Sequence, residues 1–78
     1  MRELLEYLTM GLVSDPGAVR IAESEEEDGS LVLELSVASE DFGAVIGRGG
    51  RTANALRTVI KAAATKDGRR VFVDIVDD

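Results

Sequence analysis

The chain has 78 residues, no cysteine, no histidine and a formal net charge of −6 at pH 7. This length predicts one small domain over residues 1–78, and the missing residue types exclude a disulfide framework, thiolate metal sites and the usual zinc-binding and acid–base side chains. We therefore expect no catalysis and no metal or cofactor, and the lack of a long apolar run predicts neither a signal peptide nor a membrane span, which favours a cytoplasmic location.

The first half of the sequence predicts a helix and a β-hairpin. Leucines at helical spacing, with acidic residues near the start, predict a helix over residues 2–13 that the segment 14–17 ends. Residues 18–25 are predicted to form a strand, and Asp28-Gly29 a tight turn of the type that favours positive φ. Residues 31–38 alternate between two faces with period two, so they form the return strand, with its leucines facing inward.

The second half predicts two helices and a last strand. Ser39 is the expected N-cap of a short helix over about residues 40–46, which Gly47 ends. A longer helix over residues 51–65 follows, and a turn leads to a strand over residues 70–76. The side chains expected to be buried in these elements are Phe42, Val45, Ile46, Ala53, Leu56, Ile60, Ala63, Val71, Val73 and Ile75, with Val59 and Ala64 beside them. The predicted order is αββααβ, and the predicted fold class is α/β (α+β).

The segment between the two predicted helices is the most informative in the chain. It reads Ile46-Gly47-Arg48-Gly49-Gly50-Arg51 and opens directly into the second helix. Glycines let an anionic chain approach the backbone, a helix N-terminus supplies about half a positive charge and free N–H groups, and arginines add mobile positive charge. The segment therefore predicts a clamp for a sugar–phosphate backbone.

Other glycine motifs fit this segment less well. A Walker loop needs a second glycine and a lysine that the positions from Gly43 onward lack, and a dinucleotide fingerprint starting at Gly47 needs a glycine where Thr52 stands. A helix–turn–helix corner that is rich in glycine and binds nothing stays open as an alternative interpretation.

The charges are divided between two parts of the chain. Residues 1–40 carry ten acidic and two basic side chains, whereas residues 42–73 carry seven basic and one acidic. An anion-attracting pole on an acidic body is typical of a nucleic-acid-binding surface. Asn54, Arg57 and Lys61 share one face of the longer helix, where the two basic residues either extend the positive charge of the glycine segment or are ordinary solvated charges. The basic residues after this helix are expected to complement its negative C-terminus.

The element order and the segment Gly47–Gly50 together resemble a KH domain, whose GXXG loop between two helices clamps about four backbone nucleotides. A helix before the hairpin resembles the type II KH arrangement, which implies a three-stranded sheet with the helices packed on one face. In length and in the residues Val45-Ile46-Gly47-Arg48 and Gly50-Arg51-Thr52, the chain is most similar to the small bacterial single-KH proteins of the KhpA (YlqC) family. Arg48 stands where many KH loops carry lysine, which keeps the charge and changes the geometry.

The resemblance implies a non-catalytic protein that binds single-stranded RNA with low sequence specificity, such as an RNA chaperone or a post-transcriptional regulator. The expected RNA-binding residues are Ile46, Gly47, Arg48, Gly49, Gly50, Arg51, Asn54 and Arg57. The resemblance also implies self-association, or pairing with a larger KhpB (Jag-like) KH protein. A KH-fold module that acts mainly through such a homodimer or heterodimer is the alternative function.

A groove that reads bases would need an apolar floor. Ala44 and Val45 before the glycine segment, with Leu35 or Val37 of the return strand, could supply it, although a place in the core is the plainer interpretation of most of them. The three aromatic residues of the chain offer no evident stacking platform. Affinity should therefore come mainly from phosphate contacts and fall with salt.

Overall fold

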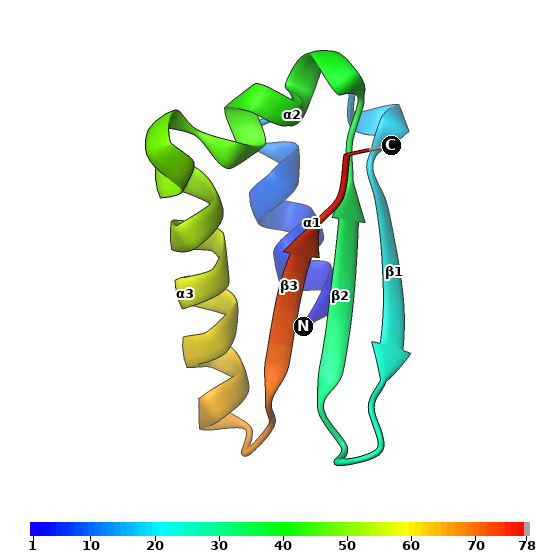
Figure 1. Cartoon of the computed structure of the whole chain (residues 1–78), viewed down its shortest axis with the longest axis vertical. Coiled ribbons are helices and arrows are strands. Elements are labelled where there is room, and N and C mark those ends of the chain that lie inside the picture. The colour runs from blue at the N-terminus through cyan, green and yellow to red at the C-terminus, as the bar shows by residue number, and fades with distance from the viewer. Residues whose placement is uncertain (78) are drawn as a thin grey trace.

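The computed structural model describes residues 1–77, which form three α-helices and a three-stranded sheet (Figure 1). The elements are helix α1 (Arg2–Met10), strands β1 (Arg20–Glu25) and β2 (Leu31–Ser36), helices α2 (Ser39–Ile46) and α3 (Arg51–Lys66), and strand β3 (Val71–Ile75). Two short 3₁₀ helices that the sequence did not predict, Pro16–Ala18 and Arg48–Gly50, lie in the connections. The predicted order of helices and strands and the mixed α+β class are confirmed.

Strand β2 lies in the middle of the sheet, in the order β1-β2-β3. It pairs antiparallel with β1, with Arg20 opposite Ser36, and parallel with β3, with Leu31 beside Val71. A parallel neighbour needs a long crossover, and α2 and α3 together provide it. This crossover carries the glycine segment to one end of the sheet.

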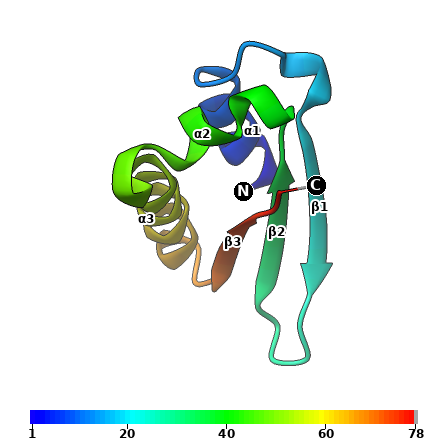
Figure 2. The same cartoon turned by 45° about the horizontal axis from the view of Figure 1, so that its top comes forward.

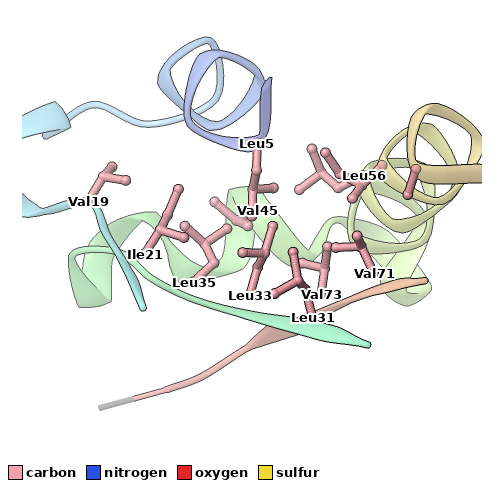
Figure 3. Packing of buried hydrophobic residues seen from close by; sticks show 12 residues of the cluster. Leu5, Val19, Ile21, Leu31, Leu33, Leu35, Val45, Leu56, Val71 and Val73 are labelled. Carbon is pink, nitrogen blue, oxygen red and sulfur yellow. The ribbon is translucent and has the colours of Figure 1, made fainter. Parts of the chain in front are cut away.

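The helices cover one face of the sheet, and the core lies between them. Leu31, Leu33 and Leu35 of β2 are buried, whereas the side chains between them in the sequence face the other way, as the period-two alternation predicted. Figure 3 shows Leu5 of α1 and Leu56 of α3 packed over these leucines, together with valines from α2 and β3. The apolar face of each helix therefore packs on the leucine face of the sheet.

The end of α1 and the start of α2 differ from the prediction. Helix α1 ends at Met10 rather than residue 13, because the next backbone N–H groups donate to carbonyls only three residues back. That of Leu12, for example, donates to the carbonyl of Thr9 at 2.9 Å. Leu12 still packs against the core, so its apolar spacing continues after the helix has ended. Helix α2 begins at Ser39 and its N-cap is Ala38, so the predicted cap at Ser39 is wrong.

Helix α3 buries a slightly different set of residues from the one expected. Its core positions are Ala53, Leu56, Ile60 and Ala64, whereas Ala63 is half-buried and Val59 is 44% exposed. The observed spacing of three, four and four residues follows the helical period more closely than a set that ends at Ala63. Phe42, Ile46 and Ile75, also expected in the core, are half-buried.

The strands are shorter than predicted, and the hairpin loop is longer. Strand β1 begins only after the 3₁₀ helix, β2 ends at Ser36 and β3 covers Val71–Ile75. In the hairpin only Gly29 has a positive φ, of 87°, so Asp28-Gly29 is not a two-residue turn with both residues left-handed. The loop closes with Glu26 donating its N–H to the carbonyl of Ser30 at 2.7 Å.

Asp41 has a structural role that the sequence did not indicate. It is only 5% exposed, and its carboxylate accepts hydrogen bonds from the Ser14 N–H at 2.9 Å, the Ser14 hydroxyl at 2.8 Å and the Asp15 N–H at 3.0 Å. These bonds hold the pKa of Asp41 below its ordinary value against partial desolvation. The carboxylate thereby joins the start of α2 to the connection between α1 and β1.

Candidate nucleic-acid interface

The glycine segment forms the corner between α2 and α3 (Figure 2). Gly47 ends α2 with φ 76° and ψ 170°, as predicted, and its N–H donates to the carbonyl of Gly43 at 2.8 Å. Gly49 and Gly50 follow with φ of 62° and 80°, both in the left-handed region. Three positive φ values within four residues favour glycine, so the sequence sets the shape of this corner locally.

The glycines of the corner serve two different purposes. A Cβ added at Gly47 would lie 2.8 Å from both the Cβ and the backbone nitrogen of Thr52, so packing within the protein requires glycine there. Cβ atoms added at Gly49 and Gly50 would meet no atom within 4 Å among the described residues. These two positions leave open space at the backbone, where a ligand can approach it.

The corner presents the N-terminus of α3. Gly50 is its N-cap, and within residues 1–77 no side chain caps this end. The first N–H groups of a helix have no partner inside the helix and carry part of its positive dipole. Arg48 and Arg51, both exposed, add full charges on either side of Gly49 and Gly50. The arrangement is suited to a phosphate group.

Asn54 and Arg57 lie one and two turns further along α3 and contact each other. The guanidinium of Arg57 donates to Asn54 Oδ1 at 3.2 Å and, through Nε, to the backbone carbonyl of Val73 in β3 at 3.2 Å. The contact with Val73 holds Arg57 between α3 and β3, in place of the freely solvated charge that the sequence left possible. An arginine has five N–H donors, so Arg57 keeps donors for a ligand.

A cleft of about 230 Å³ lies between α3 and β3 and continues the basic surface past Arg57. Its lining residues are Arg57, Lys61, Thr65, Arg69, Arg70, Val71, Phe72 and Val73. Four of these are basic and none is acidic, and Phe72 is 53% exposed. Sequence reasoning placed Arg57 and Lys61 on one helix face but missed that β3 and the turn before it bring Arg69, Arg70 and Phe72 to the same cleft.

One edge of the cleft is the backbone of β3. On either side of β3, the Val76 N–H donates to the carbonyl of Leu35 and the Arg70 carbonyl accepts from the N–H of Leu31, each at 2.9 Å. The backbone groups of even-numbered residues therefore bond to β2. Backbone groups of alternate residues point to opposite edges of a strand, so those of Val71 and Val73 point towards α3. Backbone donors and acceptors of this kind can bond to the edges of bases.

The apolar floor considered from the sequence does not form. Leu35 and Val45 have no exposed surface and belong to the core, because both lie between the sheet and the helices. Val37 is half-buried and packs against the same core, and Ala44 is exposed on α2. The interpretation of these residues as core holds for Leu35, Val45 and Val37.

The candidate residues named from the sequence differ in how far they reach the surface. Arg48, Gly49, Arg51, Asn54 and Arg57 are exposed, whereas Ile46, Gly47 and Gly50 are half-buried. All eight lie on one continuous stretch from the end of α2 into the second turn of α3.

The described part of the chain holds neither a metal-binding cluster nor a membrane-spanning helix. No group of three or more His, Cys, Asp or Glu side chains among residues 1–77 is placed to hold a metal ion. None of the helices in this range is long and apolar enough to cross a membrane.

Comparison with known proteins decides the family. A family described as "KhpA/KhpB, KH domain" matches residues 2–75. The chain belongs to this family. It is 55% identical over 78 residues to the RNA-binding protein KhpA of Halalkalibacterium halodurans, with 99% of this chain and 100% of that protein covered. Proteins of the same name from Clostridium acetobutylicum and Streptomyces coelicolor are 51% and 48% identical over 76 and 77 residues, covering 97% and 99% of this chain and 100% and 92% of those proteins.

The resemblance inferred from the glycine segment and the element order is therefore confirmed. The expectation that the chain is not an enzyme also agrees with the family, since its relatives are named as RNA-binding proteins with a KH domain.

Proposed function

We propose that this chain binds single-stranded RNA, without catalysis, at the corner between α2 and α3 and along the cleft between α3 and β3. The observation that carries the proposal is the open backbone at Gly49 and Gly50, directly before an uncapped helix N-terminus and between two exposed arginines. The names of the KhpA relatives agree with it. The expected contacts come from residues 46–51, with Asn54 and Arg57.

In this proposal, a phosphate lies at the corner and the strand continues along α3. Arg48 and Arg51 neutralise phosphates, and the N–H groups of α3 that follow Arg51 bond to their oxygens, since the N–H of Arg51 itself donates to the carbonyl of Arg48. The next nucleotides follow the basic side chains Arg57 and Lys61, while their bases face the edge of β3 and the exposed ring of Phe72. Most of these contacts are to the backbone, which gives low sequence specificity and strong dependence on salt.

The cleft favours a single strand over a double helix. A cleft of about 230 Å³ can hold one or a few nucleobases, but a duplex keeps its base edges inside and is read by proteins mainly through its outer shape. A role as an RNA chaperone or as a post-transcriptional regulator fits low specificity and is included in the proposal. The single domain over residues 1–78 and the cytoplasmic location stay predictions from the sequence.

Nuclear magnetic resonance titration tests this function. On addition of an unlabelled oligouridine, the amide signals of residues 47–52, Arg57, Lys61 and Val71–Val73 should shift, and those of α1 should stay in place. Shifts confined to α1 or to the uncovered face of the sheet would contradict the proposed site, and no shift at any usable concentration would contradict the function.

A second candidate function is self-association, and one surface favours it. An apolar groove between α1 and α3 is lined by Leu8, Leu12, Thr52, Ala55, Leu56 and Val59. Ala55, Val59 and Ala62 of α3 are exposed, small and uncharged. A two-fold dimer brings the same patch of both copies together, so the patch must tolerate itself, and an uncharged one does so. We propose that a second copy of the chain occupies this groove, and a KhpB-type partner is the alternative occupant.

Sedimentation velocity tests the dimer. Val59→Glu places a charge in the groove and should shift the distribution from dimer to monomer, whereas Ser24→Glu on the uncovered face of the sheet should not. A wild-type chain that is monomeric at every concentration tested would contradict self-association through this groove.

A further inference from the structure

The tip of the β1–β2 hairpin meets the turn between α3 and β3 at the end of the molecule away from the α2–α3 corner (Figure 1). Leu31 donates its N–H to the carbonyl of Arg70 at 2.9 Å, and the Arg70 guanidinium lies 3.6 Å from the carboxylate of Asp28. A shallow pocket between the two turns is lined by Asp28, Gly29, Ser30, Gly68, Arg69 and Arg70. Since Arg69 and Arg70 also line the cleft between α3 and β3, the basic cleft runs directly into the hairpin tip.

The hairpin tip is strongly acidic. Residues 25–28 read Glu-Glu-Glu-Asp, and all four are exposed. Asp28 is held in place because its carboxylate accepts hydrogen bonds from the Ser30 hydroxyl at 2.6 Å and the Ser30 N–H at 2.9 Å. These bonds lower the pKa of Asp28, because they stabilise its ionised carboxylate.

The charge reverses within a short distance. Asp28 lines the pocket beside Arg69 and Arg70, and three glutamates, residues 25–27, directly precede it in the hairpin. Charges interact over about 10 Å at 0.1 M salt, so a phosphate that passes Arg70 comes within range of the Asp28 carboxylate, which lies 3.6 Å from the Arg70 guanidinium. The attraction that leads a strand along α3 therefore ends at the tip.

We propose that the acidic hairpin tip, residues 25–28, acts as an electrostatic stop that ends the RNA segment held in the cleft. This inference rests on the proposed function and adds a length limit to it. A short single strand lies between the corner and Arg70, and a longer strand gains no contacts past Arg70 and is turned away from the protein there. The Asp28–Arg70 ion pair holds the stop at the end of the cleft.

The test compares RNA lengths in charge-matched variants. Glu26→Gln/Glu27→Gln removes two charges from the tip and leaves Asp28 in place, and Glu3→Gln/Glu6→Gln removes two exposed charges from α1 as the control. Fluorescently labelled oligouridines of about 5 and about 15 nucleotides are titrated at about 50 mM salt, where screening is weak. The measured quantity is the ratio of the Kd for the short RNA to the Kd for the long one. A long RNA offers more binding positions, but this advantage is the same for all three proteins, so it does not affect the comparison of their ratios.

In the tip variant this ratio should rise by about threefold over the wild type, because only the long RNA reaches the tip. In the control variant both affinities should change together and the ratio should stay the same. Equal ratios in all three proteins that bind both RNAs would overturn the stop and leave the proposed function intact. Failure of all three folded proteins to bind either RNA would overturn the proposed function and the stop with it.

Discussion

Gly47→Ala should destabilise the fold far more than Gly49→Ala, although both glycines belong to the same four-residue segment. Gly47 has φ 76° and ψ 170°, a region that is essentially restricted to glycine, and a Cβ there would lie 2.8 Å from the Cβ and the backbone nitrogen of Thr52. Gly49 has φ 62° and ψ 19°, in the ordinary left-handed region, and a Cβ there meets nothing within 4 Å among the described residues.

The expected magnitudes follow from these two environments. A side chain in the conformation of Gly47 costs about 1–3 kcal/mol, and the overpacking against Thr52 costs about as much again, which gives about 4 kcal/mol in total. At Gly49 only the left-handed conformation counts, at about 1 kcal/mol. A chain of this length has a free energy of unfolding of roughly 4–12 kcal/mol, so Gly47→Ala removes a third or more of it.

Urea unfolding followed by circular dichroism measures the difference. With a slope near 1 kcal/mol per molar urea, the midpoint should fall by about 1 M in Gly49→Ala and by about 4 M in Gly47→Ala. Thr52→Ala should rescue Gly47→Ala only in part, because the backbone nitrogen of Thr52 is one of the crowding atoms. Equal midpoints for the two alanine variants would refute the division of the glycines into one required by packing and two left open for a ligand.

Two further predictions concern acid stability and the basic cleft. Because its pKa in the folded state lies below the ordinary value of 3.8, ionised Asp41 stabilises the fold above that value, and this stabilisation is lost as the pH falls through the folded-state pKa. Asp41→Asn should therefore have a lower Tm than the wild type at pH 7, and the difference in Tm between the two proteins should become smaller in strong acid. A variant as stable as the wild type at pH 7 would contradict the role of the carboxylate. In RNA titrations, Arg57→Ala and Lys61→Ala should each reduce the salt slope by about one, whereas Lys66→Ala, outside the cleft, should leave it unchanged. A slope unchanged in Arg57→Ala and Lys61→Ala would contradict phosphate contacts by these two residues.

The parts of the fold that depend on local sequence were predictable. The alternation of β2 predicted which side chains are buried, and the glycine at position 47 predicted where α2 ends. Helix α3 was placed within one residue at its end, although its core face includes Ala64 rather than Ala63. In each of these cases the signal lies within a few neighbouring residues.

The parts that depend on residues distant in sequence were not predictable. The role of Asp41 is one example, because its partner Ser14 lies 27 residues away and meets it only in the folded chain. The cleft likewise depends on β3 lying beside α3, so that a strand edge and the turn at Arg70 join the face that carries Arg57. The residue pattern of α3 alone does not show which residues of another element lie beside it.

The most direct test of the central claim is fluorescence anisotropy of a short labelled single-stranded RNA with Arg48→Asp/Gly49→Asp. Both positions are exposed, and aspartate tolerates the left-handed conformation of Gly49, so the variant should stay folded. Arg2→Asp/Gly11→Asp makes the same change of charge at exposed positions of α1 and its C-cap and is the matched control. We predict salt-sensitive binding by the wild type and the control, and loss of binding in the corner variant by charge repulsion. Binding of equal strength by the wild type and the corner variant, with both proteins folded, would contradict the assignment of the α2–α3 corner as the RNA clamp.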